Sequence, residues 1–348
     1  MISRPLNDLS FAELQVLLGP QAHEQEARKV LAALYRPGDG PAIGEALGVR
    51  RIVLDRAREG RLARLEVVER RRAADGFLKY LFRSPLGGEF EAVRIPVFET
   101  KHVVCVSSQV GCALGCAFCH TGRLGFTRNL ETWEMVEQVR IIRDEAQRPV
   151  RHVVFMGMGE PLLNYDQVLR AAHLLCEPGG LQVSGRNITL STAGVVPAIR
   201  RYVAEGHTFR LAFSVTSADP DKRARLMPIE RRWPLSDLVE AIREYCARRR
   251  ERAMIAYVMM AGVNTGREDV EALARAFAGV PIKLDLIDVA DPSGLYRPPD
   301  SEELNRFRDE LQSLKAPVAR RYSGGLEIGA ACGTLAATRR GGTVLPAP

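Results

Sequence analysis

The chain has 348 residues, and its composition excludes several classes of protein. With 46% hydrophobic and 26% charged residues it is typical of a folded globular protein, large enough for one large domain or two ordinary ones. No apolar run reaches the length of a membrane span, and the first residues lack the apolar stretch of a signal peptide. We therefore expect a cytoplasmic protein without membrane contact. Seven cysteines in that reducing compartment indicate metal or redox chemistry rather than a disulfide framework.

The net charge of +7 is unevenly distributed. Residues 50–72 contain nine arginines against four acidic residues, and a second basic run at 248–252 closes an expected helix. Such clusters suit the phosphate backbone of a nucleic acid. An arginine-rich surface that faces only solvent gives the same pattern, so charge alone leaves nucleic-acid binding open.

Residues 1–75 have a helical pattern and are expected to form an accessory domain. Ser10 precedes the first helical stretch and Glu13 follows three residues later, which is the capping-box arrangement. The pattern continues at 24–35 and 43–49, on either side of a turn-rich segment. Residues 76–100 are expected to form a β-hairpin-like extension that turns at the glycine pair 87–88.

Residues 101–348 show short strands that alternate with helices. The expected strands are 102–107, 152–156, 187–192, 209–215, 254–260 and 282–287. This alternation predicts an α/β fold with βαβ units and a parallel sheet. Six units are fewer than the eight of a closed TIM barrel, so we expect an open, partial (β/α)6 barrel. Its chemistry should lie in the loops at the C-terminal ends of the strands.

Three cysteines follow the first of these strands in the spacing C-x3-C-x2-C: Cys112, Cys116 and Cys119. Thiolates this close in sequence can hold one metal centre, because a loop can turn each sulfur inward. A structural zinc site needs a fourth ligand, and no other cysteine or histidine has the customary spacing. The haem-attachment pattern C-x-x-C-H fits Cys116 to His120 but leaves Cys112 unexplained. Three thiolates on a four-iron cluster would leave one iron open to bind a substrate.

The segments around these cysteines resemble the RlmN/Cfr family of RNA adenine methyltransferases in the radical S-adenosylmethionine (SAM) superfamily. The resemblance covers most of residues 85–340 and rests, in chain order, on CVSSQVGCALGCAFC, GFTRNL, GMGEPLLNYDQV, ITLSTAGVVP and AACGTLA. It implies a [4Fe-4S] cluster on the three cysteines and two SAM molecules per turnover, one of them cleaved to a 5′-deoxyadenosyl radical. It also implies an rRNA or tRNA substrate, an RNA-binding role for the helical region, and an electron donor such as flavodoxin or ferredoxin. Nothing in the sequence demands more than a monomer.

By the same resemblance, the turns after successive strands hold SAM. Gly159 and Glu160 follow the second strand, where glycine permits close backbone approach and a carboxylate can pair with the methionine ammonium group. The other expected contacts are Ser191, Ser214, Val215 and Thr216.

The resemblance assigns the reaction to two further cysteines and a glutamate. Cys332 is the expected methyl carrier: one SAM methylates its sulfur, and the S-methyl group, after losing a hydrogen to the radical, adds to carbon 2 or carbon 8 of adenine. Cys105 then attacks Cys332 and releases the product through a transient disulfide. Glu91 is the expected proton acceptor, with Glu89 as its rival.

Several positions depart from the family pattern. Residues 214–217 read Ser-Val-Thr-Ser where Ser-Leu-His-Ala is usual, Ala256 replaces a glutamate, and His120 replaces a small hydroxyl residue. The asparagine that helps to hold SAM has no clear equivalent, although Asp288 and Asp291 are nearby candidates. These changes leave open a radical SAM enzyme of the same mechanism with a non-RNA substrate. An iron–sulfur sensor that binds nucleic acid is a third alternative, which SAM cleavage would exclude.

Overall fold

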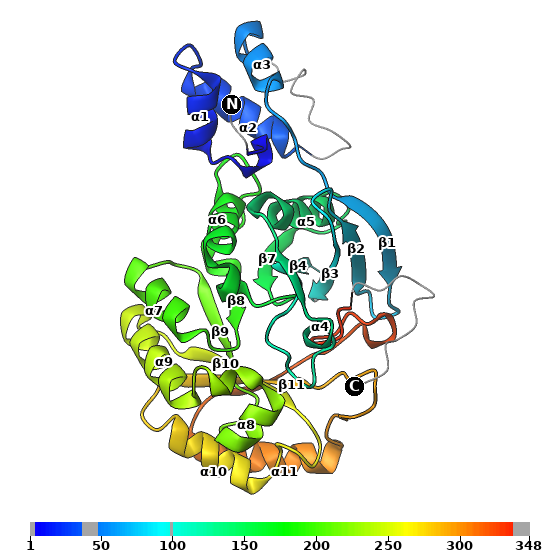
Figure 1. Ribbon diagram of the computed structural model, residues 1–348, viewed down its shortest axis with the longest axis vertical. Coiled ribbons are helices and arrows are strands. Elements are labelled where there is room, and N and C mark those ends of the chain that lie inside the picture. The colour runs from blue at the N-terminus through cyan, green and yellow to red at the C-terminus, as the bar shows by residue number, and fades with distance from the viewer. Residues whose placement is uncertain (1–3, 37–47, 98–99, 337–348) are drawn as a thin grey trace.

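A mixed ten-stranded sheet forms the centre of the computed structural model, which describes residues 4–36, 48–97 and 100–336 (Figure 1). The strand order is linear: β1-β2-β3-β4-β7-β8-β9-β10-β11-β12. The strands are β1 (Glu66–Arg72), β2 (Leu78–Arg83), β3 (Glu89–Val97), β4 (Lys101–Cys105), β7 (Val150–Phe155), β8 (Ile188–Thr192), β9 (Arg210–Ser214), β10 (Ala253–Met259), β11 (Ile282–Asp288) and β12 (Val318–Arg321). A separate antiparallel pair consists of β5 (Gln109–Gly111) and β6 (Phe126–Asn129).

The helices of the alternating units follow the outside of the curved sheet (Figure 1). They are α5 (Thr132–Asp144), α6 (Tyr165–Cys176), α7 (Val196–Glu205), α8 (Pro220–Leu226), α9 (Leu235–Arg249), α10 (Arg267–Ala276) and α11 (Ser301–Leu311). A short helix, α4 (His120–Arg123), follows the cysteine loop. At one end of the molecule lie α1 (Phe11–Leu18), α2 (Glu24–Leu34) and α3 (Arg51–Arg58).

The six expected parallel strands are confirmed as β4 and β7 to β11, which pair in parallel in chain order. A seventh, β12, pairs in parallel with β11 at the edge of the sheet. The sequence analysis missed it because its residues, Val-Ala-Arg-Arg, are too few and too charged for a strand pattern. The described sheet is open and linear, as expected of a partial barrel.

The helical N-terminal stretch is shorter than predicted. Helix α3 ends at Arg58, and residues 66–72, which were expected to be helical, form β1 at the antiparallel edge of the sheet. No residue of β1 is fully buried, and its charged side chains mask the β pattern, as is common on edge strands. The hairpin is confirmed: β2 pairs with β3 around glycines 87 and 88, both with positive φ. The segment 43–49 lies largely outside the described residues.

The N-terminal helices are joined to the barrel by partly buried polar contacts. The Ser10 capping box forms as predicted, with backbone and side-chain hydrogen bonds to Glu13. Arg170 of α6 also reaches Glu13, at 2.5 Å, and Asp8, at 3.0 Å. The guanidinium thus ties α1 and the turn before it to the core.

Candidate active site

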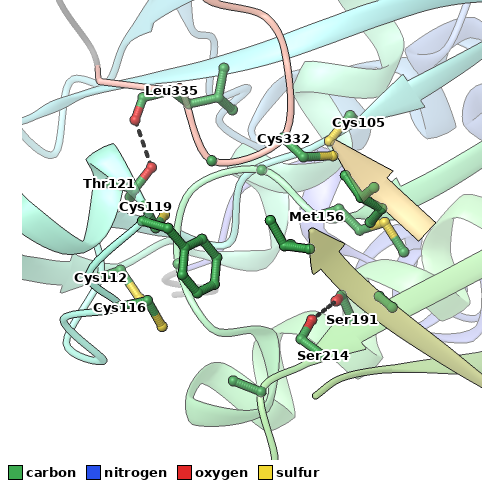
Figure 2. Close-up of a pocket in the computed structure, with 18 of the residues that line it drawn as sticks. Cys105, Cys112, Cys116, Cys119, Thr121, Met156, Ser191, Ser214, Cys332 and Leu335 are labelled. Atoms are coloured by element: carbon green, nitrogen blue, oxygen red, sulfur yellow. Dashed lines mark hydrogen bonds between the residues drawn. The ribbon is translucent and has the colours of Figure 1, made fainter. Parts of the chain in front are cut away.

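One cavity lies at the C-terminal ends of the parallel strands, and most of the expected site residues line it (Figure 2). Its wall includes Cys105 from β4, Ser191 from β8 and Ser214 from β9. The three cysteines of the loop at 112–119 also border it, and so does Cys332 from the C-terminal segment. The geometry confirms the expectation that reactive residues gather at this edge of the sheet.

The cysteine loop is held by backbone contacts rather than by regular structure. Cys119 N donates to the carbonyl of Cys116 at 3.1 Å, and Ala117 N donates to Leu226 O of α8 at 2.9 Å. Arg123 adds a hydrogen bond to Ala117 O at 2.7 Å. The loop therefore has a defined shape that turns its cysteines toward the cavity.

The chemistry of these thiols suits a metal cluster. Burial raises the pKa of Cys112 to about 12 and also raises the pKa values of Cys116 and Cys119. Such thiols become thiolates only beside a strong positive charge, which a metal centre supplies. No three potential ligand side chains of the described residues converge as a single ion would require. In a four-iron cluster each thiolate binds a different iron, so the three sulfurs need only surround one space.

Glu160 lies in the loop after β7 with both carboxylate oxygens occupied. Leu162 N donates to Oε1 at 3.0 Å, and Ala193 N donates to Oε2 at 2.8 Å. Burial raises the pKa of this carboxyl to about 7, although the backbone N–H groups oppose the shift. A carboxylate held in this way at the cavity wall is suited to pair with an ammonium group.

The glycines before Glu160 are needed for packing. A Cβ atom on Gly159, whose φ is +100°, would lie 2.6 Å from Cβ of Gln109. On Gly157 it would lie 2.7 Å from Oγ of Ser107. The sequence analysis explained such glycines by approach to a ligand, but the close neighbour in the structure is the β4–β5 segment.

The serine hydroxyls at the ends of the adjacent strands β8 and β9 lie side by side on the cavity wall, with Ser191 Oγ and Ser214 Oγ 3.5 Å apart (Figure 2). Thr216, two residues later, has a φ of +60°, a region that a β-branched residue rarely adopts. Its buried hydroxyl has no hydrogen-bond partner among the described residues. Val215 is buried but is not part of the cavity wall.

The buried amide of Asn264 holds this turn in place. It donates to Thr216 O and accepts from Met260 N, both at 2.7 Å. The sequence analysis did not identify this asparagine, whose only signal was its place in a loop after a strand. An unpaired hydroxyl, a fixed carboxylate and three thiols around one cavity fit a cluster with a bound amino-acid-like ligand.

Cys105 and Cys332 come from distant parts of the sequence, and their sulfur atoms face one another in Figure 2. Both are free thiols in the described structure, Cys105 buried and Cys332 exposed. Burial, with Cys332 as a second cause, raises the pKa of Cys105 to about 12. Surrounding protein atoms also raise the pKa of Cys332, and Arg321 opposes the shift.

Arg321 is a residue of this site that the sequence analysis missed. Its guanidinium donates to Asp285 at 2.6 Å and to Sδ of Met156, a cavity residue, at 3.3 Å. Its positive charge lowers the pKa values of both Cys105 and Cys332, against the effect of burial. The sequence analysis did not predict β12, so it gave no reason to place this arginine near the two thiols.

Glu91 lies beneath the Cys332 segment and outside the cavity wall. It is fully buried, forms an ion pair with Lys79 at 2.9 Å and accepts a hydrogen bond from Ala336 N at 2.9 Å. Its rival, Glu89, is half-buried and pairs with Arg83. Glu91 thus contacts the segment that carries Cys332, through the backbone of Ala336.

The two candidate replacements for the asparagine have other partners. Asp288 pairs with Arg320 at 2.6 Å. Asp291 accepts from Tyr296 N and from Arg123, the residue that also holds the cysteine loop. His120 follows the last cysteine, and its backbone N–H donates to Gly333 O.

The arginine-rich stretch is largely neutralised within the protein. Seven of its nine arginines form ion pairs: Arg50, Arg51, Arg56, Arg58, Arg64, Arg70 and Arg71. Arg70, for example, binds Glu145 at 2.5 Å. This stretch therefore offers less free charge to a phosphate backbone than its sequence suggests.

No described helix is both long and apolar enough to cross a membrane.

The fold and the cysteine loop are those of a radical SAM enzyme, and residues 106–277 match the Radical SAM superfamily. The chain is 62% identical to a probable RNA methyltransferase of Myxococcus xanthus, over 99% of this chain and 97% of that protein. It is 41% identical to the dual-specificity RNA methyltransferase RlmN of Anaeromyxobacter dehalogenans, over 89% and 86% of the two chains. A radical SAM methyltransferase from Sphaerobacter thermophilus superposes with a TM-score of 0.88 at 36% identity, over 96% and 99% of the chains. The protein belongs to the RlmN/Cfr family of radical SAM RNA methyltransferases.

Proposed function

We propose that this enzyme methylates a ring carbon of adenine, carbon 2 or carbon 8, in rRNA or tRNA, with Cys332 as the methyl carrier. The observation that carries the proposal is the meeting of Cys332 and Cys105 at the cavity that the three-cysteine loop borders. A carrier thiol needs a second thiol within reach if the product is to be released as a disulfide forms.

Cys112, Cys116 and Cys119 would hold a [4Fe-4S] cluster, and the adjoining wall would hold SAM. When bound, the reduced cluster supplies the electron that cleaves SAM and so starts the radical chemistry. Glu160 would bind the methionine ammonium group of SAM, with Gly159 shaping the turn. The hydroxyls of Ser191, Ser214 and Thr216 would supply neutral hydrogen-bonding groups. Val215, which is buried behind the cavity wall, would support that wall by packing.

Cys332 would first act as a nucleophile toward the methyl group of one SAM molecule. Its sulfur gains the methyl group, and the sulfonium bond breaks to release S-adenosylhomocysteine. A second SAM molecule would be needed for the radical step. Arg321 supports the first step, because a cation near the carrier favours its thiolate form.

Cys105 would release the methylated RNA from the carrier. Its thiolate attacks Cys332, the S–S bond forms as the S–C bond breaks, and the electron pair of that bond stays with the carbon, which takes up a proton to become the methyl group on the RNA. The unpaired electron that the radical step leaves on the adduct would pass back to the cluster. Glu91 would take the proton from the adenine carbon. A cellular reductant would then restore both thiols, and a flavodoxin or ferredoxin would reduce the cluster.

Mass spectrometry of the anaerobically purified, cluster-reconstituted enzyme tests this proposal. We expect a methyl group on the Cys332 peptide after SAM is added, and none in Cys332→Ala. A Cys105→Ala variant should still carry the methyl group but accumulate RNA covalently bound to the protein. An unmodified Cys332 in the presence of an intact cluster and SAM would refute the carrier role. Mapping of methylated adenosines in RNA incubated with the enzyme would then identify the substrate and the ring carbon.

A further inference from the structure

The segment that carries Cys332 is fastened to the body of the protein at three places. The first is the turn between β1 and β2. There the carboxylate of Asp75 accepts from the hydroxyl of Tyr322 at 3.0 Å and from Gly325 N at 2.8 Å. The start of the segment is therefore tied to the antiparallel edge of the sheet.

The second place is the start of α4, directly after the cysteine loop. His120 N donates to Gly333 O at 2.7 Å, and Thr121 Oγ1 donates to Leu335 O at 2.6 Å (Figure 2). These bonds flank Cys332 on its C-terminal side. They use backbone carbonyls of the segment, so they do not depend on its side chains.

The third place is the buried carboxylate of Glu91, which divides its two oxygens between two partners. Oε1 pairs with Nζ of Lys79, and Oε2 accepts from Ala336 N, each at 2.9 Å. Glu91 is fully buried and the Lys79 side chain is 5% exposed. A Cβ atom on Gly329 would lie 3.4 Å from Nζ of Lys79, so the ammonium group also lies against the segment.

The pairing of the strands fixes this geometry. Lys79 on β2 is opposite Val93, and Glu91 on β3 is opposite Leu81, so the two charged residues are diagonal neighbours on one face. Buried side chains remain charged only when each has a close partner of opposite charge. Without Lys79 the carboxylate would lose the cation that contacts Oε1, and with it the contact that orients Oε2 toward Ala336 N.

We propose that Lys79 is a positioning residue, which fixes the Glu91 carboxylate so that it latches the segment carrying Cys332 over the cavity. Ala336 N occupies the carboxylate oxygen that faces the segment. Lifting of the segment to admit a substrate would therefore also free that oxygen. The inference rests on the proposed function in one respect: it takes Cys332 to be the residue whose position matters.

Hydrogen exchange followed by mass spectrometry tests the latch without cluster, SAM or RNA. In the full-length Lys79→Met protein, we expect the amide of Ala336 to exchange at least tenfold faster than in the wild type. The matched control is Lys222→Met, which breaks the ion pair of Lys222 with Asp269 at 2.6 Å elsewhere in the barrel. In this control the amide of Ala336 should exchange at the wild-type rate. In both variants the amides of β11 should also exchange at the wild-type rate.

A second measurement reports on position rather than on stability. Diamide oxidises two nearby thiols to a disulfide and takes up their two electrons and two protons. We expect the Cys105–Cys332 disulfide to form at least fivefold more slowly in Lys79→Met, and at nearly the wild-type rate in Lys79→Arg. Alkylation of Cys246, a buried thiol bonded to Pro281 O, should stay equally slow in all variants and so reports intact folding.

If Lys79→Met does not fold, the double variant Lys79→Met/Glu91→Gln removes both charges and replaces it in both assays. Wild-type exchange at Ala336 and wild-type disulfide formation would overturn the proposal. A uniform rise in exchange that includes β11 would also overturn it, because the pair would then support only global stability. Failure of the proposed function is distinguishable, since it would appear as an unmethylated Cys332 with the latch intact.

Discussion

Replacement of Thr216 by glycine should make the protein more stable and its SAM site weaker. Thr216 combines a φ of +60° with a buried, unpartnered hydroxyl. The left-handed conformation costs a non-glycine residue about 1–2 kcal/mol, and an unsatisfied buried hydroxyl costs about 1–3 kcal/mol. Against this, the change loses one buried methyl group, about 0.8 kcal/mol, and glycine loses about 0.5–1 kcal/mol of chain entropy on folding. The balance predicts about 2 kcal/mol of added stability.

The loss of the hydroxyl should weaken SAM binding at the same time. One neutral hydrogen bond contributes about 1 kcal/mol, which corresponds to a Kd about fivefold higher. Urea unfolding of the cluster-free protein and calorimetric titration of the reconstituted protein with SAM measure the two effects. A Thr216→Ala control keeps the strained backbone and should show the weaker binding with a smaller gain in stability. A glycine variant that is less stable than the wild type, or that binds SAM equally well, would refute the reasoning.

Three further perturbations have defined outcomes. Burial would raise the pKa of Glu13, but hydrogen bonds from Arg170 and Ser10 lower it to about 2. The free energy of unfolding should therefore fall as the pH drops from about 4.5 toward 2. Glu13→Gln should flatten that dependence, which urea titrations at several pH values measure. Arg223→Met leaves Glu230 without its cation and should lower the free energy of unfolding by about 3–5 kcal/mol, whereas Arg223→Met/Glu230→Gln should recover most of that loss. Urea unfolding measures both variants, and equal losses in the two would contradict a paired role. Gly159→Ala should destabilise the loop after β7 by about 1–3 kcal/mol, and a thermal unfolding midpoint equal to that of the wild type would show that the loop can move aside.

The parallel core was predictable because its strands are short apolar runs separated by helical patterns. Cys105, Ser191 and Ser214 were expected at strand ends, and the structure places them around one cavity. The spacing of Cys112, Cys116 and Cys119 needed no structure at all to be noticed. Local spacing and strand-end position are properties that a sequence carries directly.

The remaining parts of the site depend on contacts between distant residues. Arg321 meets Cys105 only because β12 completes the sheet, and the ion pair of Glu91 with Lys79 depends on the register of β2 against β3. The ion pairs of Arg64 and Arg70 also join distant residues, because their partners, Glu137 and Glu145, lie about seventy positions away in the sequence.

The attachment of the last described segment to α4 has a consequence for the order in which the protein is assembled. The carbonyls of Gly333 and Leu335 accept hydrogen bonds from residues that directly follow the cysteine loop, and in the sequence they come after every strand of the barrel. A chain is made from its N-terminus, so the barrel and its cysteines are complete before these closing residues exist. The segment can therefore close over the cysteine loop only after the strands of the barrel have been made.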